Sequence, residues 1–122
     1  MTKKVLVVED YEDSREFMEV IITALGYQAL TANNGEEAVK ITREQIPDLI
    51  LMDVGLPVMD GLTAAEIIRN SGADISGIPI IALTAHGNVV AEEAAEVGIN
   101  EVVGKPLDYA ALEAVLFRYL GS

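Results

Sequence analysis

The sequence predicts an α/β fold, a doubly wound sheet of five parallel strands covered by helices on both faces. Short apolar runs alternate along the chain with stretches of helical periodicity. These runs are rich in β-branched residues, as is typical of strands buried on both faces of a parallel sheet. Hydrophobic residues make up 51% of the 122 residues, so that a single domain can bury a core of its own.

Three apolar runs, residues 5–8, 49–52 and 78–83, are predicted to be the inner strands of the sheet. Two further candidates, residues 27–32 and 99–103, mix apolar with polar residues, which favours positions at the edges. Strand and helix alternate five times as (βα)5, which implies right-handed crossovers. Edge positions for the second and fifth strands fit the order 2-1-3-4-5, which we predict partly by analogy with known doubly wound sheets.

The first helical stretch carries apolar residues at helical spacing, and we expect these residues to form its buried stripe. They are Phe17, Val20, Ile21, Ala24 and Leu25. Gly26 follows as the expected C-terminal cap. Asn34 and Asp60 are the predicted N-caps of the second and third helices, the third running through Ile67 and Ile68.

A stretch rich in Ala and Glu follows His86 and ends at Gly98. Its apolar stripe is thin, which predicts a weakly packed helix. The last helix is marked by Leu112, Val115, Leu116 and Tyr119. We expect Pro106 to open that helix at its first position, where a missing N–H costs nothing.

Polar side chains follow the predicted strands where the strands end. Glu9 and Asp10 follow the first strand, Asp53 the third, Thr84 the fourth and Lys105 the fifth. Because the carboxyl ends of parallel strands share one edge of the sheet, we expect these side chains to meet there. Taken singly, each residue also fits a helix cap, a loop or a solvated strand end, so the prediction depends on the combination.

Three carboxylates at one edge repel one another and raise each other's pKa. A hard divalent cation relieves this repulsion, and Mg²⁺ prefers carboxylate, water and phosphate oxygens. Glu9, Asp10 and Asp53 therefore predict a Mg²⁺ site, which Mn²⁺ would also fit, with phosphate chemistry beside it. An Asp carboxylate can attack phosphorus and form an acyl phosphate. Lys105 and the Thr84 hydroxyl would supply a cation and a hydrogen-bond donor for the phosphoryl oxygens.

The motifs around these residues resemble the receiver domain of two-component response regulators. They occupy residues 5–10, 51–53 with 56–61, 83–85 and 104–106, and so span nearly the whole chain in the order of that family. The resemblance implies a CheY-like, flavodoxin-like fold and a single receiver domain over residues 1–122. It also implies a phosphorelay role in which the domain catalyses only its own phosphorylation and dephosphorylation, without turnover of an external substrate.

The resemblance assigns roles to individual residues. Asp53 would accept a phosphoryl group from a sensor histidine kinase or a phosphotransfer protein. Mg²⁺ would be held by Glu9, Asp10, Asp53 and the Gly55 carbonyl. The phosphoryl oxygens would be held by Thr84, the Ala85 amide and Lys105. The Lys105–Pro106 peptide bond is often cis in this family.

Two features depart from the usual family pattern. Many receivers carry Tyr or Phe three residues before the lysine, where this chain has Val102. We therefore expect the readout to rely on backbone shifts in residues 84–88 and in the following helix. The positions two after Asp53 and two after Thr84 tend to influence hydrolysis of the acyl phosphate, and here they are Gly55 and His86. Gly55 has no side chain to position or block a water. His86 is interpreted as a solvated first-turn residue, and the alternative is a hydrogen bond from this side chain near the phosphoryl group.

Three other functions fit the sequence less well. A Mg²⁺-dependent phosphatase with an Asp nucleophile needs a second Asp two residues later, where this chain has Gly55. A flavodoxin-like binding module would have a Ser, Thr and Gly-rich phosphate loop after its first strand, where this chain is acidic at residues 9–13. A pseudo-receiver scaffold would normally have lost Asp53 or the acid pair, and both are present.

Charge and composition exclude several partners. A formal net charge of −12 without a Lys/Arg cluster argues against nucleic acid. No apolar run approaches the roughly 18 residues that would span a membrane, and no signal peptide is visible at the N-terminus. The chain has no Cys, so it has no disulfide framework or thiolate metal site. We expect a cytoplasmic monomer.

A downstream protein target is expected on the face formed by the fourth helix, the fifth strand and the fifth helix of the (βα)5 pattern. This face carries Glu92, Glu93, Glu96, Glu101, Asp108 and Glu113. Its acidity favours a partner with some basic character. The chain ends just after the last helix, so we expect no effector domain within it. Three outputs remain open: binding a target alone, passing the phosphoryl group onward, or serving as one domain of a larger protein.

Overall fold

The computed structural model describes residues 2–55, 59–85, 87–105 and 107–121, without the side chains of residues 87–90. The motif residues 56–58, His86, and Pro106 with its expected cis bond therefore lie outside the described part of the chain.

Five parallel strands form one sheet in the order β2-β1-β3-β4-β5, which confirms the predicted topology. The strands are β1 (Lys4–Val8), β2 (Gln28–Ala32), β3 (Leu49–Asp53), β4 (Ile80–Thr84) and β5 (Glu101–Gly104). Every residue of β3 and β4 is buried, whereas the edge strands β2 and β5 are partly exposed. The polar composition of the two edge strands thus reflects the single neighbour that each has.

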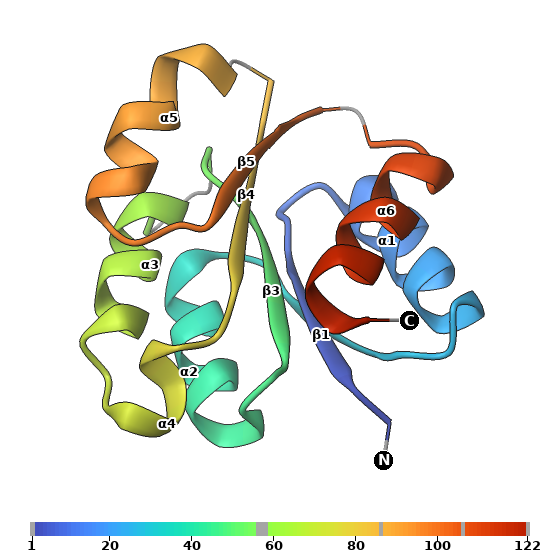
Figure 1. Cartoon of the computed structure of the whole chain (residues 1–122), viewed down its shortest axis with the longest axis horizontal. Coiled ribbons are helices and arrows are strands. Elements are labelled where there is room, and N and C mark those ends of the chain that lie inside the picture. Colours follow the sequence, from blue (N-terminus) through green and yellow to red (C-terminus); the bar gives the residue numbers. More distant parts are fainter. Residues whose placement is uncertain (1, 56–58, 86, 106, 122) are drawn as a thin grey trace.

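Helices connect the strands and cover both faces of the sheet (Figure 1). They are α1 (Glu12–Ala24), α2 (Gly35–Gln45), α3 (Gly61–Arg69), α4 (Ala73–Ser76), α5 (Gly87–Glu96) and α6 (Tyr109–Leu120). The single-turn α4 was not predicted. It lies between Gly72, which has a positive φ of 112°, and Gly77, and it buries only Ile75.

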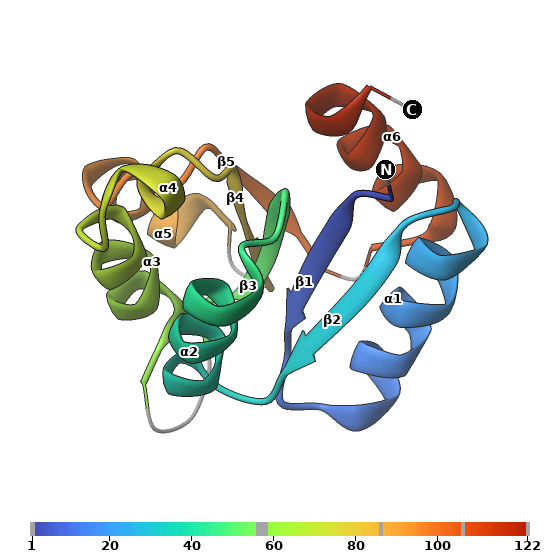
Figure 2. The same ribbon diagram turned by 90° about the horizontal axis from the view of Figure 1, so that it is seen from below.

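The two faces of the sheet carry separate apolar cores. Figure 2 shows α1 and α6 on one side of the sheet and α2, α3, α4 and α5 on the other. One core joins Leu6, Ile50 and Ile80 to α2, α3, α4 and α5. The other joins Val7 and Leu51 to α1 and α6. Neighbouring strand residues point to opposite faces, so a run that is apolar throughout contributes to both cores.

The buried stripe of α1 differs from the predicted one. Ile21 is buried as expected, but Phe17 and Val20 are 50% and 67% exposed, and Ala24 is exposed as well. The sheet instead receives Met18 and Ile22. Both sets of residues have helical spacing, and the side on which α1 meets α6 and the sheet decides which set is buried.

The helix caps follow the predictions except at the last helix. Asn34 Oδ1 accepts a hydrogen bond of 2.8 Å from the Glu37 amide, and Asp60 Oδ1 accepts one of 2.8 Å from the Thr63 amide. Gly26 ends α1 with a φ of 95°. The expectation that Pro106 opens α6 is wrong, because α6 begins at Tyr109 with Asp108 as its N-cap. The Asp108 side chain supplies the acceptor that a helix start requires.

Two lysines at the start of β1 contact the C-terminal ends of two helices. Lys3 Nζ donates to the Leu120 carbonyl of α6 at 2.9 Å, and Lys4 Nζ donates to the Gln45 carbonyl of α2 at 3.2 Å. A cation at this position satisfies carbonyls that have no partner within the helix. Within the described residues, no helix is long and apolar enough to cross a bilayer.

Candidate functional site

Three carboxylates meet at the carboxyl ends of β1 and β3, as the sequence predicted. Glu9 and Asp10 follow β1, and Asp53 is the last residue of β3. One oxygen from each carboxylate lies within 4.8 Å of the other two. Glu9 is 1% exposed and Asp53 8%, whereas Asp10 is exposed. The group therefore has a buried side and a side that is open to solvent.

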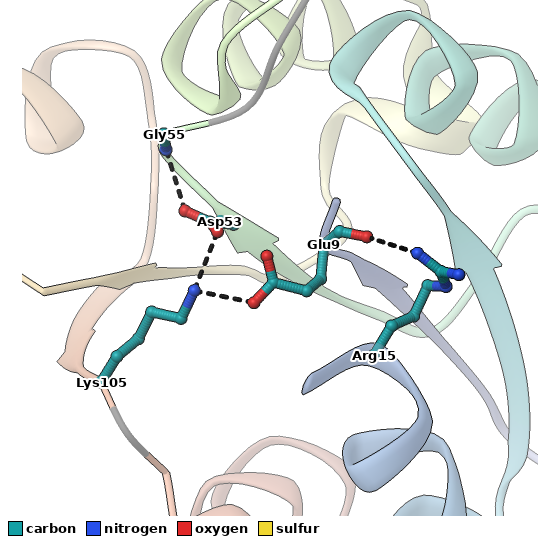
Figure 3. A network of polar contacts seen from close by, with 5 residues as sticks. All are labelled: Glu9, Arg15, Asp53, Gly55 and Lys105. Carbon is teal, nitrogen blue, oxygen red and sulfur yellow. Dashed lines mark hydrogen bonds and ion pairs between the residues drawn. The ribbon is translucent and has the colours of Figure 1, made fainter. Parts of the chain in front are cut away.

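Lys105 joins two of these acids across the end of the sheet (Figure 3). Its Nζ lies 2.7 Å from Glu9 Oε1 and 2.9 Å from Asp53 Oδ2. Its amide donates to the Thr84 carbonyl at 2.8 Å, which continues the pairing of β5 with β4 beyond Gly104. Lys105 is thus held by the sheet and carries the positive charge that the sequence placed here.

The two buried acids have opposite pKa shifts. Burial raises the pKa of Glu9 from 4.5 to about 7, and the neighbouring Asp53 adds to the rise, which Lys105 opposes. Burial also acts to raise the pKa of Asp53, but Glu9, Lys105 and the Gly55 amide outweigh it and hold that pKa below its ordinary value. Without a metal, the Glu9 carboxyl is partly protonated near neutral pH, while Asp53 stays ionised. Asp53 is therefore the carboxylate that is available as a nucleophile.

Lys105 itself remains a cation in this setting. Burial acts to lower the pKa of Lys105, and its hydrogen bonds with Glu9 and Asp53 outweigh this effect, so that its pKa is raised. The fixed ammonium group of Lys105 can neutralise additional negative charge on a group that binds or reacts at Asp53.

Backbone groups complete the surroundings of Asp53. The Gly55 amide donates to Asp53 Oδ1 at 2.9 Å, so Gly55 contacts the acid through its N–H. Thr84, the last residue of β4, is 5% exposed and lies one position beyond Leu83, the register partner of Asp53. Ala85 follows at the surface. Thr84, Ala85 and Lys105 therefore lie at the same sheet edge as the acids.

Two further residues that the sequence reasoning did not single out support the acids. Arg15 Nη1 donates to the Glu9 carbonyl at 3.1 Å, which ties α1 to the end of β1. A Cβ at Gly61 would lie 2.5 Å from the Asp53 carbonyl oxygen and 2.9 Å from Val54 Cα. Only glycine therefore allows α3 to start so close behind Asp53. The signal for Gly61 was its place after an N-cap, and no local signal marks Arg15.

The donor set fits a hard divalent cation. Glu9 Oε2 is buried and has no hydrogen-bond partner among the described residues. A buried carboxylate oxygen without a partner is costly, and a cation ligated by the acid group would relieve this cost. The exposed Asp10 leaves room for the waters that Mg²⁺ usually retains.

A pocket of about 660 Å³ opens beside the acids. It is lined by Glu9, Ser14, Phe17, Met18, Leu83, Ala85, Lys105, Leu107 and Asp108. The exposed face of Phe17 thus borders the site. Val102, which stands where many receivers have an aromatic residue, is half-buried and packs against the core under α2, α3, α4 and α5.

Comparison with known proteins decides the family. The model of the response regulator receiver domain matches residues 5–117 of the chain. The chain belongs to this family. The predicted receiver role in two-component signalling is thereby confirmed. The chain is a receiver domain of signalling proteins and is not classed with the metabolic enzymes.

Relatives of the receiver domain occur both as short proteins and as parts of longer ones. The chain is 35% identical over 123 residues to the polar-differentiation response regulator DivK of Brucella ovis, covering 100% of this chain and 99% of that protein. It is 39% identical over 113 residues to the probable transcriptional regulator ycf27 of Porphyra purpurea, covering 92% of this chain but 45% of that protein. The chain thus spans about half the length of the ycf27 relatives that it matches.

Two solved structures resemble the receiver domain closely. The receiver domain of the sensor histidine kinase PA1611 from Pseudomonas aeruginosa PAO1, with a magnesium ion coordinated in its active site cleft, is 35% identical, with 100% of each chain covered and a TM-score of 0.89. The receiver domain of Ssk1, co-crystallised with the Saccharomyces cerevisiae phosphotransfer protein Ypd1, is 29% identical, with 97% of this chain and 88% of that chain covered and a TM-score of 0.87. Receiver domains thus bind Mg²⁺ at an acidic pocket and interact with histidine kinases or phosphotransfer proteins.

Proposed function

We propose that Asp53 accepts a phosphoryl group from a phosphohistidine on a sensor kinase or phosphotransfer protein. The observation that carries this proposal is the buried Asp53 carboxylate, which Lys105 and the Gly55 amide keep ionised. An Asp53 oxygen forms a bond to phosphorus as the bond from phosphorus to the histidine nitrogen breaks. The imidazole keeps that electron pair and can then take up a proton. A loose transition state of this kind requires positioning and charge neutralisation more than proton transfer at Asp53.

The other residues of the site bind the phosphoryl group or the metal. Glu9, Asp10, Asp53 and the Gly55 carbonyl would hold Mg²⁺, or Mn²⁺ in its place. When bound, the metal would neutralise charge on the phosphoryl oxygens. Lys105 moves from its bridge between Glu9 and Asp53 onto a phosphoryl oxygen. The Thr84 hydroxyl and the Ala85 amide, at the end of β4, donate to the other oxygens.

Acetyl phosphate tests this proposal without a protein donor. We expect Mg²⁺ and acetyl phosphate to increase the intact mass of the protein by one phosphoryl group. Asp53→Ala and chelation of Mg²⁺ should each abolish the adduct. Asp74→Ala, which removes an exposed acid of α4, is the matched control and should leave the adduct unchanged.

An absent adduct would be resolved with beryllofluoride. A stable complex of protein, Mg²⁺ and beryllofluoride would mean that the acyl phosphate hydrolyses quickly. Failure of both reagents would reject the phosphoacceptor proposal and favour a scaffold role.

We also propose that the phosphodonor protein docks over the start of α1. Tyr11, Phe17 and Val20 are 61%, 50% and 67% exposed, and Phe17 borders the pocket beside Lys105. Exposed acids at Glu12 and Glu16 flank these apolar side chains, which favours a partner that combines apolar and basic residues. The surface is therefore chemically suited to a protein that must reach Asp53.

A phosphorylated histidine phosphotransfer protein tests this docking surface. The double substitution Phe17→Ala with Val20→Ala should slow phosphotransfer by about ten-fold, while uptake from acetyl phosphate stays unchanged. Ile46→Ala removes an apolar side chain of comparable exposure, 47%, beyond the end of α2 and serves as the control. Equal slowing with both donors would contradict the docking role, since it would indicate damage to the site.

We propose that the protein is a monomeric single domain that acts in the cytoplasm. We also propose that its downstream target binds the face formed by α5, β5 and α6. Glu92, Glu93 and Glu113 are exposed there, but Glu101 is engaged by Arg118 and by the Tyr119 hydroxyl at 2.9 Å. Glu101 therefore contributes less free charge than the sequence suggested. A target affinity that does not fall with added salt would contradict a basic partner.

A further inference from the structure

Arg69 forms a dense hydrogen-bond cluster at the end of the molecule opposite Asp53. It is the last residue of α3, and its guanidinium binds oxygens of the segments that precede β4 and β5. Nε donates to the Gly98 carbonyl at 2.9 Å, and Nη1 donates to the Ser76 and Ile78 carbonyls at 2.8 and 2.7 Å. Nη2 donates to Asn100 Oδ1 at 2.8 Å. One side chain of α3 thus holds together the two segments that precede β4 and β5.

The contact with Gly98 fixes the C-terminal end of α5. Gly98 has a φ of 87°, and the Ile99 amide donates to the Ala94 carbonyl at 2.9 Å, an arrangement that closes a helix end. A Cβ at Gly98 would lie 2.9 Å from Arg69 Nε, so Arg69 packs directly on this glycine. The positive guanidinium also faces the negative end of the helix dipole.

Asn100 ties the same segment to the sheet. Its side-chain Oδ1 accepts from the Ile80 backbone amide at 2.9 Å as well as from Arg69. Its backbone amide donates to the Ile80 carbonyl at 2.9 Å. The side chains of Arg69 and Asn100 therefore fix the residues that follow α5 against the start of β4. The planar fork of an arginine suits such a multiple contact, and lysine cannot reproduce it.

The described side chains of α5 reach the apolar core near the same end. Among its residues 91–96, only Ala94 is buried, and beyond the helix Val97 and Ile99 contact the core. The other end of α5 follows Thr84 and Ala85 at the phosphoryl-binding edge. The helix thus joins the proposed reaction site to a fixed point.

We propose that Arg69 is the positioning residue on which α5 pivots when Asp53 is phosphorylated. The inference rests on the proposed function, because a shift of Thr84 and Ala85 toward the phosphoryl group displaces the start of the helix. Arg69 and Asn100 hold residues 98–100 in place, so the displacement becomes a tilt rather than a sliding of the whole helix. Such a tilt supplies a readout in a receiver that has Val102 in place of an aromatic switch residue.

Backbone amide NMR and the Arg69 Nε–H signal test the pivot, with beryllofluoride and Mg²⁺ as the phosphoryl mimic. In the wild type, we expect chemical shifts to change at Thr84, Ala85 and the first half of α5. The amides of residues 98–100 and the Arg69 Nε–H should keep their positions. Shift changes at residues 98–100 as large as those at Ala85 would overturn the pivot.

Arg69→Lys and Arg69→Gln provide the second arm. In the unmodified variants, amide exchange at residues 97–101 should rise by about ten-fold or more, and on addition of the mimic the shift changes should extend through residues 98–100. Arg43→Gln is the control for loss of charge, because among the described residues this arginine of α2 makes one side-chain hydrogen bond, to Ser71. Exchange rates and response patterns in the Arg69 variants that match the wild type would overturn the inference.

The two proposals fail in distinguishable ways. If the wild type takes up neither phosphoryl group nor beryllofluoride, the phosphoacceptor function is rejected. The anchoring of α5 by Arg69 is still decided by the exchange rates of the unmodified proteins. If the adduct forms but the Arg69 variants respond as the wild type does, the pivot is rejected while the function stands.

Discussion

Lys105 Nζ lies 2.7 Å from Glu9 Oε1, a contact that passes over the ends of β3 and β4 to join the last strand of the sheet to β1. The same nitrogen contacts Asp53, so one cation serves two buried carboxylates. The electrostatic balance of the site therefore depends on one side chain.

Lys105→Met should destabilise the metal-free protein at neutral pH by about 1–3 kcal/mol, because two buried carboxylates lose their cation. Asp53 has a lowered pKa in the folded state. Its ion pair with Lys105 therefore contributes fully to the stability of the protein at pH values above 3.8, the ordinary pKa. This contribution is lost as the pH falls through the lower pKa of the folded state. The difference between variant and wild type should accordingly shrink in acid. Urea unfolding at several pH values measures it. Lys40→Met, at an exposed lysine of α2, should cost almost nothing, and an equal loss there would contradict the prediction.

The raised pKa of Glu9 predicts a dependence on both pH and Mg²⁺. The folded protein holds a proton on Glu9 up to about pH 7, whereas the unfolded chain loses it near 4.5. In the presence of a chelator, this group therefore makes stability fall as the pH rises from about 4.5 to about 7. Mg²⁺ competes with the proton, so its affinity should rise over the upper part of this range and its binding near pH 7 should release protons.

Glu9→Gln isolates this effect. The variant should lose that part of the pH dependence, and calorimetry in two buffers of different ionisation enthalpy should detect less proton release on Mg²⁺ binding. Proton release equal to that of the wild type would assign the titration to another group.

Gly61→Ala should disturb the site from behind. The added methyl group would meet the Asp53 carbonyl oxygen at 2.5 Å, so the end of β3 or the start of α3 must move. We expect a loss of about 1–3 kcal/mol in stability and slower phosphoryl uptake from acetyl phosphate. Gly77→Ala is the matched control, because a Cβ there meets nothing within 4 Å and the φ of −96° suits alanine. Normal uptake by Gly61→Ala would show that the site tolerates the shift.

Thr42→Val should stabilise the protein. Thr42 is fully buried in α2, and its Oγ1 has no hydrogen-bond partner among the described residues. Replacing an unsatisfied buried hydroxyl by a methyl group of similar size should raise the free energy of unfolding by about 1 kcal/mol. Thr23→Val, at an exposed position of α1, measures the effect of the substitution on a helix alone. A lower melting temperature for Thr42→Val than for the wild type would point to a bond that the hydroxyl makes in solution.

The acid group could be predicted because strand order alone brings distant residues together. Glu9 and Asp53 stand directly after or at the end of an apolar run, and Lys105 follows the mixed last strand. Parallel strands bring such positions to one edge. The inner strands were also clear, since their residues serve both cores and are therefore apolar throughout. For both features, the signal is local in the sequence even though the contacts are not.

The features that sequence reasoning missed depend on tertiary contacts. On α1, Phe17 and Met18 belong to overlapping stripes of equal periodicity, and only the position of α6 and the sheet selects Met18. Arg69 looks like an ordinary arginine at a helix end, because its acceptors come from two later segments, residues 76–78 and 98–100. The start of α6 was misplaced because proline is typical of a first helical position, whereas in the structure the Asp108 side chain forms the cap.

The contact between Lys3 and Leu120 has a consequence for how the domain can be used. It holds the two ends of the described chain side by side at the amino ends of the strands, whereas the acids lie at the carboxyl ends. A tether attached to either end would therefore leave the reactive edge accessible. The same contact suggests that the ends could be joined by a short linker and new ends opened elsewhere, giving a circular permutant. With its ends side by side and away from the acids, the domain could be fused at either terminus of a larger polypeptide or inserted within one.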